Sequence, residues 1–143
     1  MSHPHAAARS FTIGNDLAEI GRLAEAVDDF CAGHGLGDEV AHAFNLALDE
    51  LLTNTINYGY DDAERHRITV GLSISGPHVT AIVEDDGRAF DPTQAGEPDI
   101  EAELDDRPIG GLGIHFARAM MDDIGYERVE GLNRLTLTKH LGA

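Results

Sequence analysis

A glutamate and an asparagine four residues apart are the first pair of side chains in this sequence suited to chemistry. Glu50 and Asn54 lie in a segment with helical periodicity, so they project from the same side of a helix about one turn apart. The asparagine oxygen suits a hard cation such as Mg²⁺, and the glutamate could orient or deprotonate a hydroxyl nucleophile near a phosphate. An exposed polar pair on a helix surface gives the same pattern, so the spacing alone leaves both interpretations open.

A second candidate site follows an apolar strand that ends at Asp85, with Gly87 and Ala89 directly after it. A carboxylate at this position can accept a hydrogen bond from the exocyclic amine of adenine, directly or with a water completing the match. The two small residues would let the backbone pass close to a flat ring. Asp-Gly pairs are also common in turns, so an acidic turn without a ligand is the alternative.

The third stretch is Gly110-Gly111-Leu112-Gly113, which opens a predicted helix after an acidic segment. Glycines there expose backbone N–H groups, and a helix N-terminus favours anions, so a phosphate chain could lie on it. The stretch is not a P-loop, since no Lys-Ser or Lys-Thr follows, and it is not the dinucleotide fingerprint. A flexible hinge is the alternative. Arg107 is the nearest cation for a terminal phosphate, although it could equally pair with Asp105 or Asp106.

The helices that must position these residues are predicted from apolar residues that recur every three or four positions. One is predicted over residues 17–31 with Asn15 or Asp16 at its start, and a second is capped by Asp38 and ended by Gly59. A third helix is predicted over 114–121.

The strands are predicted from segments in which apolar and polar residues alternate and which are bounded by turn residues. They are predicted at 10–13, 68–75, 78–84, 124–129 and 132–139, with turns at Gly76-Pro77 and Glu130-Gly131. This order of elements predicts an α/β (α+β) two-layer sandwich, a mostly antiparallel mixed sheet with helices on one face.

Length and composition favour one globular domain over residues 1–143. The chain is 42% hydrophobic and 25% charged, and no apolar run approaches the roughly 18 residues needed to cross a bilayer. The first ten residues have no apolar stretch typical of a secretion signal, so we expect a cytoplasmic protein.

The net charge limits the classes of partner, and the cysteine and histidine residues limit the classes of reactive or metal site. A net charge of −16 disfavours binding to nucleic acid or an anionic membrane and favours a protein partner, although acidity could serve only solubility. The single cysteine, Cys31, lies in the apolar register of a predicted helix, so we expect a core residue rather than a reactive thiol. The eight histidines do not have zinc-site spacing, and no structural metal is expected.

Taken together, the three stretches resemble the ATP-binding domain shared by gyrase-type ATPases, sensor histidine kinases and anti-sigma serine kinases, which has the histidine-kinase-like (Bergerat) fold. Residues 50–60 are similar to the N box of that superfamily, 85–92 to its first glycine box and 110–113 to its second. The whole chain most resembles the anti-sigma factor kinases. The Leu-Gly-Ile helix that ends in Met-Asp and the closing Gly-Leu-Asn-Arg-Leu-Thr-Leu strand add to this resemblance.

The resemblance implies a protein that binds ATP with Mg²⁺ and phosphorylates a serine or threonine of an anti-sigma factor antagonist of the STAS type. It also implies that the protein sequesters a sigma factor and that it forms a homodimer. By resemblance, Glu50 is the base, Asn54 the magnesium ligand and Asp85 the adenine reader, while residues 93–107 form the ATP lid. The other nucleotide contacts would be Gly87, Ala89, Arg107, Gly111, Leu112 and Gly113.

Two positions depart from the family pattern, because Tyr58 stands where many members have histidine and Ala89 where glycine is usual. Neither removes a group with an assigned role, although the methyl group of Ala89 could weaken or shift a bound ring. A binding module that uses nucleotide without catalysis is the alternative function. A detached catalytic domain of a histidine kinase is a third, which the lack of a two-helix dimerisation segment disfavours.

Overall fold

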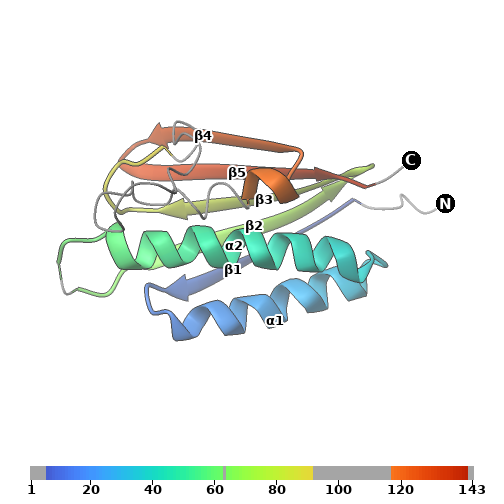
Figure 1. Ribbon diagram of the computed structural model, residues 1–143, viewed down its shortest axis with the longest axis horizontal. Helices are drawn as coiled ribbons and strands as arrows, with labels where there is room; N and C mark the ends of the chain where they lie inside the picture. The colour runs from blue at the N-terminus through green and yellow to red at the C-terminus, as the bar shows by residue number, and fades with distance from the viewer. Residues whose placement is uncertain (1–5, 63, 92–116, 142–143) are drawn as a thin grey trace, which may run out of the picture.

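The computed structural model describes residues 6–62, 64–91 and 117–141. These residues form two layers, an antiparallel sheet and a pair of helices that covers one of its faces (Figure 1). The helices are α1 (Ala18–Gly33) and α2 (Asp38–Tyr58), and residues 117–120 form a short helical turn. The strands are β1 (Ala6–Gly14), β2 (Arg67–Ser75), β3 (His78–Asp85), β4 (Asp123–Val129) and β5 (Leu132–His140).

The sheet has the strand order β1-β2-β3-β5-β4, and every pairing between the described strands is antiparallel. The expected strands, both turns and the two-layer sandwich with a mostly antiparallel sheet are confirmed, and the described strands include no parallel pair that would make the sheet mixed. Hairpins join β2 to β3 and β4 to β5, which makes those pairs antiparallel. Two successive helices connect β1 to β2, so the chain reverses three times and β2 also runs against β1.

The core lies between the sheet and the two helices. Alternate residues of β2, from Ile68 to Ile74, are buried, as the predicted alternation requires. Phe44, Leu48 and Leu52 of α2 are each at most 2% exposed and contribute the opposite wall. Cys31 is 3% exposed in this core, where burial raises the pKa of its thiol, so the expectation of a core cysteine is confirmed.

The helix ends agree with the sequence except at one residue. Leu17 occupies the N-cap position of α1, and Asp16 supports the same helix start because its Oδ1 accepts a hydrogen bond from the Ala18 amide at 3.0 Å. Asp38 is not an N-cap, because the extended Gly37 occupies that position and no side chain caps α2. As the first helical residue, Asp38 still places a negative charge at the positive end of the helix. Neither α1 nor α2 is both long and apolar enough to cross a membrane.

Candidate functional site

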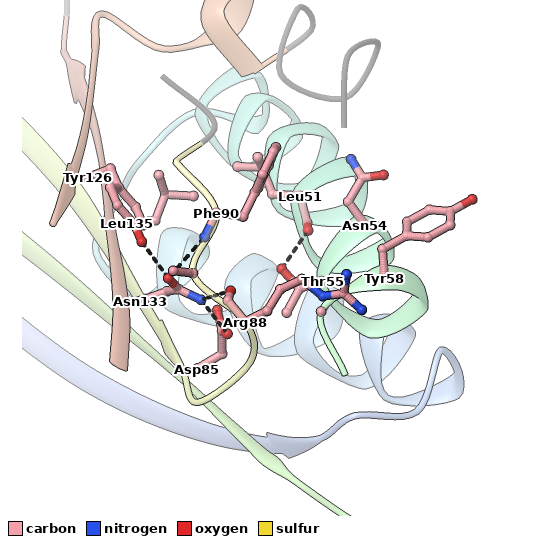
Figure 2. A pocket seen from close by; sticks show the side chains of 12 residues that line it. Leu51, Asn54, Thr55, Tyr58, Asp85, Arg88, Phe90, Tyr126, Asn133 and Leu135 are labelled. Atoms are coloured by element: carbon pink, nitrogen blue, oxygen red, sulfur yellow. Dashed lines mark hydrogen bonds between the residues drawn. The ribbon is translucent and has the colours of Figure 1, made fainter. Parts of the chain in front are cut away.

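A cavity of about 100 Å³ opens between the C-terminal part of α2 and the end of the sheet where β3 finishes and β5 begins (Figure 2). Its walls combine apolar side chains with a small number of polar groups, as is typical of small-molecule sites. The lining residues are Leu51, Asn54, Thr55, Tyr58, Gly59, Asp85, Arg88, Ala89, Phe90, Tyr126, Asn133 and Leu135.

Four of the residues singled out by sequence line this cavity, and they come from different elements. Asn54 and Tyr58 project from α2 on one side, and Asp85 lies at the end of β3 on the other (Figure 2). Packing of α2 over the sheet therefore brings the predicted magnesium ligand and the predicted adenine reader to one cavity. Ala89 also lines the cavity, in the segment that follows β3.

Asp85 is a buried carboxylate with one oxygen held by the protein. It is 7% exposed, and its Oδ1 accepts hydrogen bonds from the Gly87 amide at 2.9 Å and from Asn133 Nδ2 at 3.0 Å. Burial raises the pKa of this carboxyl group, while the two hydrogen bonds oppose the rise because they favour the charged form. No described residue donates to Oδ2, which leaves that oxygen for a ligand.

Asn133 is the residue that sequence reasoning missed. Its amide oxygen accepts hydrogen bonds from the Tyr126 hydroxyl at 2.5 Å and from Arg128 Nη1 at 3.1 Å. Its amide nitrogen donates to Arg88 O at 2.8 Å as well as to Asp85. One sequence signal could have found it, because Asn133 occupies the buried register of β5. A polar residue in a core register needs partners, and such partners often belong to a site.

Gly87 is fixed by an approach between two backbone segments. A Cβ at this position would lie 2.7 Å from the carbonyl oxygen of Gly59, the residue that ends α2. The same oxygen accepts a hydrogen bond from the Arg88 amide at 2.8 Å. The glycine therefore joins the turn after β3 to the end of α2, and its contact with a ligand stays a prediction.

The remaining predicted residues divide into two groups. Glu50 lies on α2 one turn before Asn54, is half-buried and is not among the residues that line the cavity. Arg107, Gly111, Leu112 and Gly113 fall outside the described residues, as does the predicted lid over 93–107. The roles assigned to all of these residues stay predictions.

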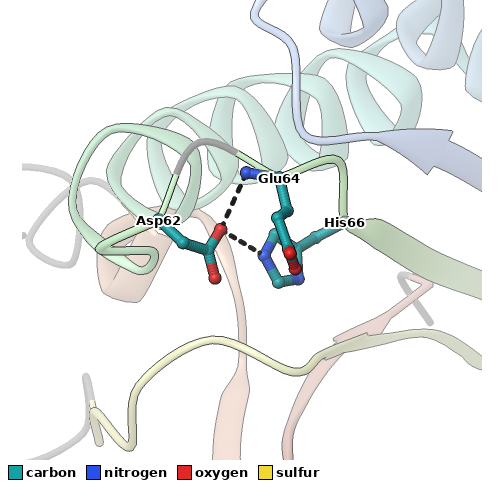
Figure 3. Close-up of side chains that lie close together, drawn as sticks. All are labelled: Asp62, Glu64 and His66. Atoms are coloured by element: carbon teal, nitrogen blue, oxygen red, sulfur yellow. Dashed lines mark hydrogen bonds and ion pairs between the residues drawn. The ribbon is translucent and has the colours of Figure 1, made fainter.

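A cluster in the connection between α2 and β2 contacts Asp86, the neighbour of Asp85. His66 Nε2 lies 2.8 Å from Asp62 Oδ1 (Figure 3). His66 Nδ1 lies 3.0 Å from Asp86 Oδ1. Neutral imidazole has only one N–H, so two carboxylate partners favour the doubly protonated ring. Both hydrogen bonds accordingly raise the pKa of His66, the one to Asp62 most strongly. The ring also stacks on Tyr60, with centroids 4.3 Å apart.

The same cluster contains three side chains of metal-binding type. Ligand atoms of Asp62, Glu64 and His66 lie within 4.8 Å of one another, which is close enough to share an ion (Figure 3). However, the nitrogen of His66 that faces this group is already bonded to Asp62. We therefore assign the cluster to an ion-paired connection between the segment after α2 and Asp86, the neighbour of Asp85.

Comparisons with known proteins agree with this geometry. A family model described as the histidine kinase-like ATPase domain matches residues 13–139. The serine/threonine-protein kinase BtrW of Bordetella bronchiseptica is 36% identical over 95 residues, covering 66% of this chain and 67% of BtrW. The serine-protein kinase RsbW of Listeria monocytogenes is 25% identical over 130 residues, covering 88% of this chain and 81% of that kinase.

A solved structure has the same fold. The crystal structure of the RsbU and RsbW domains of a Mycobacterium tuberculosis protein superposes with a TM-score of 0.68 at 18% identity. The superposition covers 94% of this chain but only 32% of that longer one. At this identity, the likeness shows the fold.

Proposed function

This chain belongs to the histidine kinase-like ATPase domain family, and from that premise we propose that it is an anti-sigma factor with protein kinase activity. It binds ATP with Mg²⁺, phosphorylates a serine or threonine of a STAS-type antagonist protein, and sequesters a sigma factor. The observation that carries the proposal is the shared cavity of Asn54 and Asp85. The kinase names of its relatives, at 25% and 36% identity, support the same activity.

The described part of the cavity fits the base of a nucleotide. Leu51, Phe90 and Leu135 supply apolar walls for a flat ring. Asp85 Oδ2, to which no described residue donates, can accept the hydrogen of the adenine amine. The volume of about 100 Å³ lies below the roughly 300–1,000 Å³ of whole ligand pockets, so this part accommodates the ring and the phosphates extend beyond it.

The proposed contacts with Mg²⁺ and the phosphates come from α2 and from the glycine stretch at residues 110–113. Asn54 offers an amide oxygen to Mg²⁺, which would supply charge neutralisation at the phosphates when bound. Glu50, one turn earlier on α2, orients the acceptor hydroxyl and takes its proton. We assign contacts with the phosphates to Gly111, Leu112, Gly113 and Arg107 by resemblance, and the role of lid to residues 93–107.

The remaining features of the proposal concern the whole protein. We propose one ATP-binding domain over residues 1–143 that acts in the cytoplasm as a homodimer. Its partners are the antagonist and the sigma factor, with no direct role for nucleic acid or membrane. The net charge of −16 supports protein partners over polyanions.

A phosphotransfer assay tests the catalytic part. The protein is incubated with Mg²⁺, γ-labelled ATP and a STAS-type antagonist, and labelled phosphoserine or phosphothreonine is measured on the antagonist. The Glu50→Gln variant should lose at least about 100-fold in the rate of transfer while keeping its ATP affinity. Asp49→Asn is the matched control, because Asp49 is the exposed neighbour on α2 and its loss should leave transfer intact.

The outcomes separate catalysis from binding alone. ATP at about 100 times its Kd should stabilise the protein by ~2.7 kcal/mol, which a thermal shift detects. Stabilisation by ATP without transfer to any STAS-type antagonist would replace the kinase with a nucleotide-dependent binding module. No stabilisation by ATP would overturn the proposed function altogether.

A further inference from the structure

We propose that Asn133 is the positioning residue that sets the purine preference of this cavity, by keeping Asp85 charged and turning one carboxylate oxygen toward the ligand. The inference rests on the proposed function, since it concerns the nucleotide that Asp85 would read. It gives a role to Asn133, which lies in the closing Gly-Leu-Asn-Arg-Leu-Thr-Leu strand but was assigned none from sequence, and it gives a reason for adenine over guanine.

The preference follows from the protonation state of Asp85. Adenine presents an amine donor where guanine presents a carbonyl acceptor. An ionised carboxylate can only accept hydrogen bonds, so it binds the adenine amine and repels the guanine oxygen. A protonated carboxyl group can also donate, and it would lose this discrimination. The selectivity of the cavity therefore depends on the charge of Asp85.

The surroundings of Asp85 act against that charge. The residue is 7% exposed, and burial is the main cause of its raised pKa. Asn133 Nδ2 and the Gly87 amide are the two donors that oppose protonation, both at Oδ1. Of the charged neighbours, the Asp86 carboxylate raises the pKa of Asp85 further and the Arg128 guanidinium lowers it. Both bonds are made to Oδ1, no described residue donates to Oδ2, and Asp85 lines the cavity.

The amide of Asn133 is itself held in one orientation. Tyr126 OH and Arg128 Nη1 both donate to its Oδ1, at 2.5 and 3.1 Å. A flipped amide would point its NH₂ group at these two donors and its oxygen at the Asp85 carboxylate. Donors on β4 thus force the Asn133 nitrogen to face Asp85.

Asn133 acts through Asp85 and not on the base directly. Its two N–H hydrogens are directed at Asp85 Oδ1 and at Arg88 O. Its oxygen already accepts hydrogen bonds from the Tyr126 hydroxyl, Arg128 Nη1 and, at 3.5 Å, the Phe90 amide, so both of its lone pairs are engaged. The side chain lines the cavity with its polar atoms engaged by protein.

Two variants of the full chain test the proposal. Asn133→Leu removes the donor at similar volume, and Asn133→Asp replaces it with a like charge of nearly the same shape. Thr136→Val is the matched control, because Thr136 lies on the same strand in the alternate register. The pKa of Asp85 is measured by carboxyl ¹³C NMR without nucleotide, with Asp85→Asn used for assignment. Affinities for ATP and GTP are measured from pH 5 to 8.

In both variants the pKa of Asp85 should rise by about one or more, because a hydrogen bond to a charged group is lost. The ratio of ATP affinity to GTP affinity at neutral pH should fall by roughly 10- to 100-fold. The pH at which the ratio falls should also move upward. Thr136→Val should match the wild type in all three measurements.

The inference and the proposed function fail in different ways. If both nucleotides lose affinity equally while the pKa of Asp85 stays unchanged, Asn133 is only structural and the inference is overturned. If the wild type binds no ATP, the proposed function fails, and the purine preference fails with it. If the pKa of Asp85 still rises in the variants, that result would then support only the claim that Asn133 keeps Asp85 charged.

Discussion

The carbonyl oxygen of Gly59 lies 2.7 Å from where a Cβ on Gly87 would stand. The first residue ends α2 and the second belongs to the turn after β3, so this contact joins the two elements that carry Asn54 and Asp85. The Arg88 amide closes the same junction with a 2.8 Å hydrogen bond to Gly59 O. The two predicted ligand groups therefore share a cavity because two backbone segments meet without an intervening side chain.

Gly87→Ala should destabilise the fold by about 1–3 kcal/mol, the usual cost of forcing extra volume into a packed site. The added methyl group would meet Gly59 O and Asp85 Oδ1, which lies 2.9 Å away, so ATP affinity should fall as well. Urea unfolding and ATP titration measure the two effects. Gly71→Ala is the matched control, since a Cβ at Gly71 meets nothing within 4 Å. Equal stability of the two variants would show that the junction tolerates a side chain.

Asp85→Asn should abolish the preference for ATP over GTP, because an amide can donate to the guanine oxygen and a carboxylate cannot. Total affinity for ATP should fall about tenfold or more, as one charge-assisted hydrogen bond is lost. Competition titrations with both nucleotides give the ratio.

Glu84→Gln is the control for Asp85→Asn. Glu84 precedes Asp85 on β3 but pairs with Arg134, outside the residues that line the cavity. A variant at Asp85 that keeps full selectivity for ATP would remove this residue from base recognition.

The sequence predicted the secondary structure well because its signals are local. Alternating residues and turn glycines located both hairpins to within one or two residues, and only Asp38 was misassigned at a helix start. Periodicity predicted the two helices between β1 and β2, but it does not reveal that these two strands are neighbours in the sheet. The strand 10–13 was also predicted too short, since β1 extends from Ala6 to Gly14.

The site was harder to predict, because its hydrogen bonds join residues that are distant in sequence. Asn133 reaches Asp85 through the register of β5 against β3, and no local pattern fixes that register. His66, the residue before β2, reaches Asp86, the residue after β3, because β2 and β3 are paired. Motif spacing identified residues that would contact a ligand, whereas the residues that hold them in place are recognised only once the strands are paired.

Asn54→Ala should remove the part of ATP affinity that depends on Mg²⁺, because it deletes the proposed oxygen ligand from the cavity wall. In the wild type, EDTA should weaken ATP binding, while the variant should bind ATP with the same, weaker affinity in Mg²⁺ or EDTA. Calorimetric titrations under both conditions give the comparison. Asn45→Ala is the control on the same helix, where the side chain bonds to Asp28 away from this cavity. A variant whose affinity still depends on Mg²⁺ as in the wild type would exclude Asn54 as the ligand.

His66→Gln should lower the free energy of unfolding in a pH-dependent way. The hydrogen bonds to Asp62 and Asp86 raise the pKa of His66 above its ordinary value of 6.5, so the folded state binds the proton more tightly than the unfolded state. The stabilisation is then fully present below about pH 6.5 and is lost as the pH rises through the raised pKa. The difference between wild type and variant should therefore be largest near pH 6 and shrink toward pH 9.

Urea unfolding from pH 5.5 to 9 measures this difference, and His42→Gln, an exposed change on α2, serves as the control. Below this range the opposite dependence begins, because the pKa of Asp62 is lowered by its bond to His66 and protonation of that carboxylate breaks the pair. A difference that stays constant across the range would mean that His66 contributes through its stacking on Tyr60 and not through charge. A difference that grows with pH would require a neutral ring in the fold, which the two carboxylate contacts at 2.8 and 3.0 Å oppose.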